Sequence, residues 1–174
     1  MKRSIFLFVI QMLCLGTIVW GQDQSDVDKD WRWIIPLETI KVEIENKFGE
    51  SITREKDHPF QTYVTVFGKI NIAYAKEKQF VKECSCTVKA DTVLDYYVSP
   101  AKRFKLSDLK LDLSKFKKDD TYSPRELSYF NEKEGILIAT EIVKLDDGTS
   151  QERVFALEYR PTGASCSATR CKTK

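Results

Sequence analysis

The sequence predicts an α+β fold in which one or two short helices lie on one face of an antiparallel sheet. An amphipathic stretch from Ile35 to Gly49 has the spacing of a helix. Several later segments alternate apolar and polar residues, and the dipeptide Asp147-Gly148 is a strong hairpin turn. Helices and an antiparallel sheet in one chain bury their apolar sides by packing as two layers.

The predicted helix has a beginning, an apolar stripe and an end. The hydroxyl of Thr39 can cap its first turn, and Gly49 follows its last apolar residue, where a left-handed C-cap needs no Cβ. The stripe consists of residues at helical spacing: Leu37, Ile40, Ile44 and Phe48. A strand is the alternative, because Ile40, Val42 and Ile44 also alternate with charged residues.

Six segments are predicted as strands, because they are rich in β-branched and aromatic residues and are bounded by turn residues. They cover residues 60–67, 70–75, 92–98, 127–131, 135–145 and 151–159. Residues 105–116 are expected to form a second short helix or an irregular segment. Helical spacing is doubtful there, since Leu109, Leu111 and Leu113 alternate.

The order of these elements suggests an internal duplication. Residues 37–48 resemble residues 106–116 with one deletion, and each stretch precedes three predicted strands. Residues 31–161 would then be one α+β domain built from two α-β-β-β halves, 31–100 and 101–161. Chance similarity between short amphipathic stretches is the alternative, and the predicted architecture does not depend on the duplication.

Residues 1–21 have the features of a secretory signal peptide. Lys2 and Arg3 precede an apolar run, and small residues precede Gln22, where cleavage is expected. An uncleaved anchor is the alternative, but the run is shorter than the ~20 residues that a membrane span requires. Leu13 before Cys14 is too bulky for a lipid-attachment signal. The sequence therefore predicts a secreted or periplasmic protein with no membrane span after cleavage.

Removal of the signal peptide changes the charge balance. The whole chain has 28 basic and 26 acidic residues, and residues 1–21 contain two basic residues and no acidic one. The mature chain therefore has 26 of each and no net charge. Residues 22–30 form a locally acidic leader that we expect to be flexible. A neutral protein has no long-range field that attracts nucleic acid, so nucleic acid is not an expected partner.

Four cysteines remain after cleavage, and an even number in an exported chain indicates disulfides. They lie in one short loop and in the tail of residues 162–174: Cys84, Cys86, Cys166 and Cys171. A bond across the single residue between Cys84 and Cys86 would be strained, so pairing between the loop and the tail is expected. Free thiols and a zinc site are the alternatives, although these spacings suit zinc poorly.

Residues 31–161 contain a set of short motifs: Pro36-Leu37-x-Thr39 through Gly49, Tyr74, Thr92-Val93, Val98-x-Pro100, Leu109-x-Leu-x-Leu-Ser-Lys-Phe-Lys117, Tyr129-x-Asn131 and Gly135-Ile136. In these motifs the chain resembles a family of uncharacterised secreted bacterial proteins. The helix followed by glycine also resembles β-lactamase-inhibitor-like domains and small outer-membrane-assembly lipoproteins. This second resemblance implies helices on an antiparallel sheet and a protein-binding function. The chain differs from those lipoproteins in lacking a usable lipid-attachment cysteine.

The sequence contains no motif that defines a reaction, a cofactor or a metal site. His58 is the only histidine, so a serine or cysteine triad has a single available imidazole. The carboxylate pairs Asp119-Asp120 and Asp146-Asp147 are expected to lie in turns, where Asp is favoured for backbone reasons. A cell-envelope hydrolase that uses a carboxylate pair remains the alternative function, because such pairs meet in space and not in sequence.

The leading hypothesis is an exported, non-enzymatic protein-interaction module whose partner is another exported or envelope protein. Tyrosine is enriched at interfaces, and the chain has several tyrosines in its predicted strands. We expect the interface on the sheet face opposite the helices, with about half of the following residues in the core instead: Tyr63, Tyr96, Tyr97, Tyr129 and Tyr159.

Overall fold

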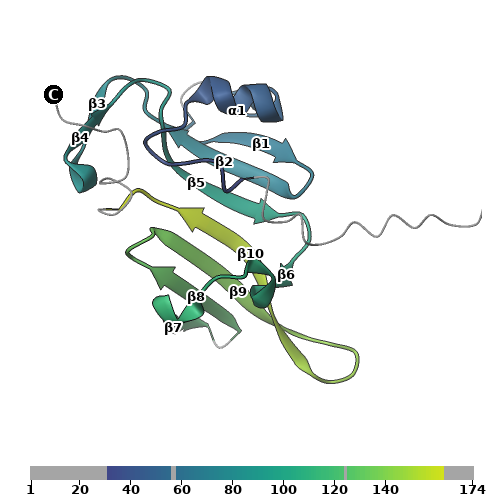
Figure 1. The fold of residues 1–174 in the computed structure, drawn as a ribbon. Coiled ribbons are helices and arrows are strands. Elements are labelled where there is room, and N and C mark those ends of the chain that lie inside the picture. Colours follow the sequence, from purple (N-terminus) through teal and green to yellow (C-terminus); the bar gives the residue numbers. More distant parts are fainter. Residues whose placement is uncertain (1–30, 56–57, 124, 163–174) are drawn as a thin grey trace, which may run out of the picture.

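The computed structural model describes residues 31–55, 58–123 and 125–162. In this part of the chain the fold is mostly β, with a large antiparallel sheet and a single α-helix (Figure 1). The predicted α+β class is therefore wrong. The sequence indicated antiparallel strands correctly, but it overestimated the helices and missed four short or polar strands.

The elements follow one another in the order of the chain. The helix is α1 (Lys41–Phe48), and three short 3₁₀ turns are η2 (Lys82–Cys84), η3 (Leu106–Leu109) and η4 (Leu113–Lys115). The strands are β1 (Gln61–Thr65), β2 (Gly68–Tyr74), β3 (Gln79–Val81), β4 (Cys86–Val88), β5 (Val93–Pro100), β6 (Phe104–Lys105), β7 (Lys117–Ser123), β8 (Glu126–Asn131), β9 (Ile136–Lys144) and β10 (Ser150–Tyr159).

The main sheet has the strand order β1-β2-β5-β10-β9-β8-β7, and β6 adds to β10 beyond the end of β5. Every pair in it is antiparallel. Strands β3 and β4 form a separate two-stranded hairpin, which lies apart from the main sheet in Figure 1. The connection between β2 and β5 runs through this hairpin, so the hairpin lies at one end of the sheet.

A three-stranded group and a four-stranded group meet at the centre of the sheet. The β1-β2-β5 group joins the β10-β9-β8-β7 group through β5 and β10, where Tyr96 lies opposite Tyr159. The rings of these two tyrosines stack with centroids 4.6 Å apart. This strand order is the one expected when two antiparallel meanders pair through their last strands. The duplication proposed from the sequence stays a prediction.

The hydrophobic core lies on one face of the main sheet. Alternate residues of the central strands point to this face, among them Ile70, Val98 and Ile138, and all three are buried. Helix α1 covers the first group through Ile44, which is fully buried. Trp31 closes the same core and packs edge to face on Phe67 at 5.7 Å.

Helix α1 is shorter than predicted, and it begins at Lys41 after the cap residue Ile40. The backbone N–H of Ile40 donates to Glu43 Oε2 at 2.9 Å, which satisfies the helix start. Thr39 was predicted as the cap, but its Oγ1 accepts the N–H of Ile35 at 2.8 Å instead. The predicted position of the end is confirmed, because Gly49 follows the helix with a φ of 81°; its ψ of −172° differs from the left-handed cap that was predicted.

The second half contains no α-helix within its described residues. Residues 105–116 form the 3₁₀ turns η3 and η4, separated by Lys110 in the left-handed region with a φ of 51°. Leu106 and Leu109 of η3 reach the core, while Leu111 and Leu113 are only half-buried against it.

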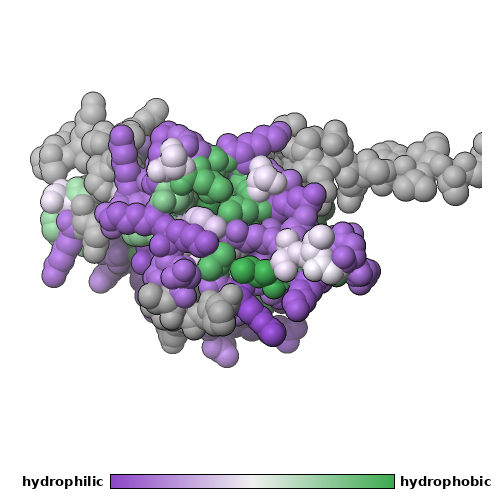
Figure 2. Space-filling model, turned by 90° about the horizontal axis from the view of Figure 1, so that it is seen from below, coloured by the Kyte–Doolittle hydropathy of each residue, from purple (hydrophilic) through white to green (hydrophobic). Residues whose placement is uncertain are grey.

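Figure 2 looks from below Figure 1, where β7 and β8 lie, and shows apolar surface surrounded by hydrophilic side chains.

All six predicted strands are present with shifted ends, as β1, β2, β5, β8, β9 and β10. The turn between the first two strands is at residues 66–67, and Gly68 begins β2 earlier than the predicted start at residue 70. A Cβ on Gly68 would lie 2.1 Å from the backbone oxygen of Ser99, so glycine is required where β2 meets β5. Asp119 and Asp120 lie in strand β7, not in the predicted turn.

Candidate functional site

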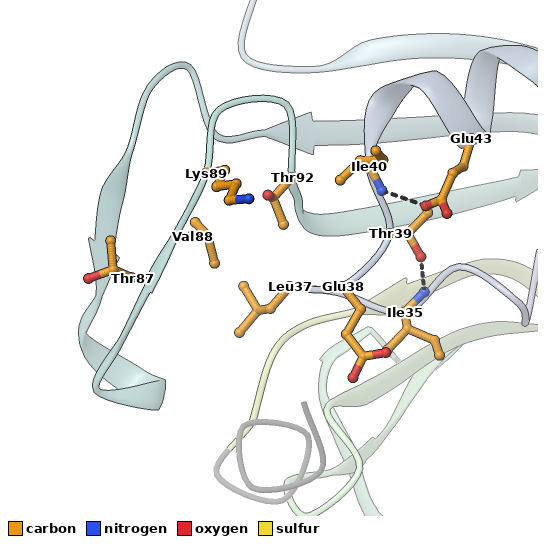
Figure 3. A pocket seen from close by; sticks show the side chains of 10 residues that line it. All are labelled: Ile35, Leu37, Glu38, Thr39, Ile40, Glu43, Thr87, Val88, Lys89 and Thr92. Carbon is orange, nitrogen blue, oxygen red and sulfur yellow. Dashed lines mark hydrogen bonds between the residues drawn. The ribbon is translucent and has the colours of Figure 1, made fainter. Parts of the chain in front are cut away.

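An open hollow of about 560 Å³ lies between the segment that leads into α1 and the connection from β4 to β5 (Figure 3). Pockets of this size accept small ligands or single side chains of a partner. The hollow is lined by Ile35, Leu37, Glu38, Thr39, Ile40, Glu43, Thr87, Val88, Lys89 and Thr92. In Figure 3 these side chains come from two segments that face one another across the gap.

Backbone hydrogen bonds fix the two walls to each other. Leu37 N–H donates to Val93 O at 2.7 Å, and Val93 N–H donates to Thr39 O at 2.9 Å. Lys41 N–H donates to Asp91 O at 2.8 Å, and Ile40 forms an isolated antiparallel bridge with Thr92. These bonds preorganise the hollow, because neither wall can move without breaking them.

The backbone beside the hollow is strained. Leu37 has a φ of 67° and Asp91 has a φ of 63°, a region that residues with a side chain rarely adopt. The conformation of Leu37 is held by packing, since its side chain is 6% exposed in a satellite cluster with Val81 and Val88. Strain of about 1–3 kcal/mol persists only where surrounding structure over-determines it, and such positions gather at functional sites.

The chemistry of the lining suits binding. Ile35 and Ile40 are 45% and 39% exposed, which is high for large apolar residues. The polar members are threonines, two glutamates and Lys89, with no histidine and no cysteine among the lining residues. An apolar group in the hollow could therefore contact the exposed isoleucines, while the polar lining residues stay hydrated.

The structure separates the five predicted interface tyrosines. Tyr63 and Tyr96 are buried in the core, at 0% and 1% exposure, and Tyr129 and Tyr159 are half-buried against it. Tyr97 is the exception, because it is 38% exposed on the opposite face of the sheet. The tyrosine-rich face is thus the one that α1 covers, and only Tyr97 lies on the face predicted to bind a partner.

The buried tyrosines use their hydroxyl groups inside the protein. Tyr74 OH donates to Tyr63 OH at 3.1 Å, and burial raises the pKa of both phenols. Tyr129 OH donates to Glu152 Oε2 at 3.1 Å; burial and this carboxylate raise the pKa of Tyr129 to about 12. These phenols stay protonated at neutral pH, so they act as hydrogen-bond donors within the fold.

The described cysteines lie in the β3–β4 hairpin, not in the loop that was predicted. Cys84 ends η2 and is half-buried, whereas Cys86 begins β4 and is 2% exposed. Neither is left without a partner in the structure. Cys84 Sγ lies 3.9 Å from Thr162 O, at the end of the described chain. Cys166 and Cys171 lie outside the described residues, so the expected pairing stays a prediction.

The carboxylate pairs named from the sequence are exposed at the surface, Asp119-Asp120 in β7 and Asp146-Asp147 in the turn before β10. The structure brings together a different pair on the open face of the sheet. Burial is the largest of the effects that raise the pKa of Asp95, and the negative charge of Glu158 raises it further. The positive charge of Arg160 lowers it. Glu158 Oε1 accepts a hydrogen bond from Arg160 Nε at 2.5 Å.

Within residues 31–55, 58–123 and 125–162, no group of three or more His, Cys, Asp or Glu side chains is arranged to hold a metal ion. None of the helices in these ranges has the length and apolar character needed to cross a membrane.

Comparison of the chain with protein-family models, with curated proteins and with solved structures gives no match. The hollow was not predicted from the sequence. Thr39 and Ile40 were assigned to the helix alone, and nothing in residues 87–92 indicated a wall opposite them. The available signal was the dipeptide Ile35-Pro36, because a proline disfavours helical backbone at the residue before it.

Proposed function

We propose that this protein is an exported interaction module whose hollow receives an apolar side chain of another exported or envelope protein. The observation that carries the proposal is the pair of exposed isoleucines, Ile35 and Ile40, at a preorganised concavity. Protein interfaces draw most of their binding energy from a few anchor side chains that fill such pockets. The exported location rests on the predicted signal peptide.

The geometry supports a protein partner for two reasons. The hollow is open to solvent, so an anchor side chain can enter while its backbone stays outside. Other exposed apolar residues lie on the connected elements, with Val42 on α1 at 53% and Phe80 on β3 at 60% exposure. An interface that extends from the hollow over these residues would bury more apolar area than a small ligand could.

Charge substitution at the rim tests the proposal. The protein would be used to capture partners from an exported or envelope fraction, followed by mass spectrometry. Ile40→Arg should abolish capture of the specific partner, because a guanidinium at the rim cannot be desolvated without cost. The matched control is Val64→Arg, at a residue that is 54% exposed on β1, far along the chain from the hollow. Equal capture by both variants would contradict the proposed site.

A second candidate function is hydrolysis of a cell-envelope polysaccharide by the carboxyl groups of Asp95 and Glu158. The observation that favours it is the difference in their surroundings, since burial raises the pKa of Asp95, as suits a general acid, while Glu158 accepts a hydrogen bond from Arg160. Asp95→Asn and Glu158→Gln should each abolish release of reducing ends from envelope polysaccharide. Unchanged turnover in both variants, or no turnover in the parent protein, would rule out this function.

A further inference from the structure

A line of five side chains crosses the face of the main sheet opposite the core. The strand register places them side by side from β2 to β8: Asn71, Tyr97, Glu158, Leu137 and Phe130. We call this line the open strip. Direct neighbours in such a line have Cβ atoms about 4.5–5.5 Å apart, so the five side chains form one continuous surface.

The open strip points away from the core. Its members alternate along their strands with core residues such as Tyr96, Leu157 and Ile138. The described segments that pack on the sheet, which include α1, residues 31–34 and η3, contribute to the core on the other face. Tyr97 is 38% exposed, and the other four members are half-buried beside their neighbours.

The strip combines aromatic rings with planar polar groups. The rings of Tyr97 and Phe130 lie three strands apart, which corresponds to about 14 Å. Asn71 lies beside Tyr97, and its Oδ1 accepts from Thr62 Oγ1 at 2.8 Å, which orients the amide. On the other side of Tyr97, Glu158 is oriented by its hydrogen bond from Arg160. Both polar groups are thus fixed beside an exposed ring.

The charges of the strip indicate a neutral ligand. Within it, Glu158 is paired with Arg160 at 2.5 Å. At its margin, Lys117 lies opposite Phe130 and is paired with Glu132 at 3.0 Å, while burial raises the pKa of Asp95 beside Glu158. A strongly charged partner would therefore find little net opposite charge here. The groups that remain are ring faces, which pack on C–H surfaces, and an amide, a carboxylate and a guanidinium, which hydrogen-bond hydroxyl groups. A chain of sugar units offers both kinds of surface along its length.

We propose that the open strip binds a neutral saccharide chain that lies across the strands. Its sugar rings stack on Tyr97 and Phe130, and its hydroxyl groups bond to Asn71 and to the Glu158–Arg160 pair. This site is separate from the hollow and requires no hydrolysis, so it stands whether or not either function proposed above is correct.

Titration calorimetry with defined oligosaccharides tests this site. The probes are neutral hexasaccharides of glucose, galactose, mannose and N-acetylglucosamine, with a hexamer of galacturonic acid as the charged counterpart. We expect at least one neutral hexamer to bind and to bind more tightly than the charged one. Tyr97→Ala should weaken this binding at least about tenfold, as the loss of a stacking ring does. Tyr97→Phe should keep it, because the ring remains.

The matched control is Tyr129→Phe, which changes a tyrosine on the core face of the same sheet. Its saccharide affinity should equal that of the parent protein. Thermal unfolding of each variant checks that the fold is intact, which is expected for Tyr97→Ala because the residue is exposed. The proposal is overturned if no neutral hexamer binds, if the charged hexamer binds more tightly, or if Tyr97→Ala binds as the parent does.

Discussion

At the scale of single residues, Ile44 is the side chain that attaches α1 to the sheet. It is fully buried in the main core, whereas Val42, two positions earlier, is 53% exposed. We expect Ile44→Ala to lower the free energy of unfolding by about 2–5 kcal/mol, as truncation in a core does. Val42→Ala should change it by less than about 0.5 kcal/mol, as surface substitutions usually do. Urea unfolding of the two variants measures the difference.

A strand at this place would give another result. Ile40, Val42 and Ile44 would then share one face, and truncation of Val42 would cost as much as truncation of Ile44. Equal losses would therefore contradict α1 as it is described. The helix was correctly chosen from the sequence because Gly49 ends it, while the capping role of Glu43 was overlooked in favour of Thr39.

Asp95 should make stability depend on pH. Its pKa is raised by burial and by Glu158, so the folded protein holds this proton more tightly than the unfolded chain. As pH rises from the usual aspartate pKa through the raised value, the folded state loses stability. Asp95→Asn should therefore be more stable than the parent at neutral pH, and the gain should vanish below the usual aspartate pKa.

Denaturant unfolding at several pH values measures this effect, with Asp120→Asn on the exposed strand β7 as the control variant. The control should follow the parent protein at every pH. A constant difference between Asp95→Asn and the parent over the whole range would show that the amide acts through packing and not through titration.

At the scale of elements, the sequence predicts strands well where β-branched and aromatic residues alternate, as in β2, β5 and β9. It fails for β7, whose residues Lys117 to Asp120 are charged and lie at an edge. Charged residues are used to protect edge strands, so their composition resembles a loop. It fails also for β3 and β4, which are only three residues long and depend on their pairing with each other.

A second short helix or an irregular segment was expected at residues 105–116, and the structure has the irregular alternative. Lys110 adopts a left-handed conformation after η3, which ends the helical turn before a second one can form. The core then takes Leu109 from this segment, whereas from the first segment it takes Ile44. Tertiary packing overrides a weak local preference in such short segments.

The candidate sites were less predictable from the sequence than the strands and helices were. The hollow joins residues 35–43 to residues 87–92, and only the pairing of Leu37 and Thr39 with Val93 brings them together. The open strip depends on the register of five strands. Neither arrangement leaves a local pattern in the sequence, because each arises from contacts between distant segments.

At the scale of the whole molecule, we expect at least one disulfide between Cys84 or Cys86 and the tail. Thr162 lies beside Cys84, and four residues can span up to about 14 Å, so Cys166 is within reach. Closure of a loop of roughly 80 residues would stabilise the protein by about 4 kcal/mol in the chain-entropy model. Non-reducing peptide mapping should find this bond. Finding only free thiols, or only bonds within each pair, would refute it.

The expected export of the chain leads to another prediction. The basic head and apolar run of residues 1–21 should be removed, so the mature protein should begin at or near Gln22. Mass analysis of the N-terminus of the exported protein measures this. A mature chain that still begins with Met1 would show that the segment is not a cleaved signal peptide.

Site-specific photo-crosslinking tests the central claim, that the hollow receives a side chain of an exported partner, most directly. A photoreactive phenylalanine analogue would replace Ile40 at the rim and, as the control, Ile142 on β9, since both residues are similarly exposed, at 39% and 37%. We predict one discrete adduct with an exported protein from position 40 and none from position 142. The adduct should disappear when Ile35→Arg is added. Identical adducts from both positions, or no adduct from position 40, would contradict the proposed function.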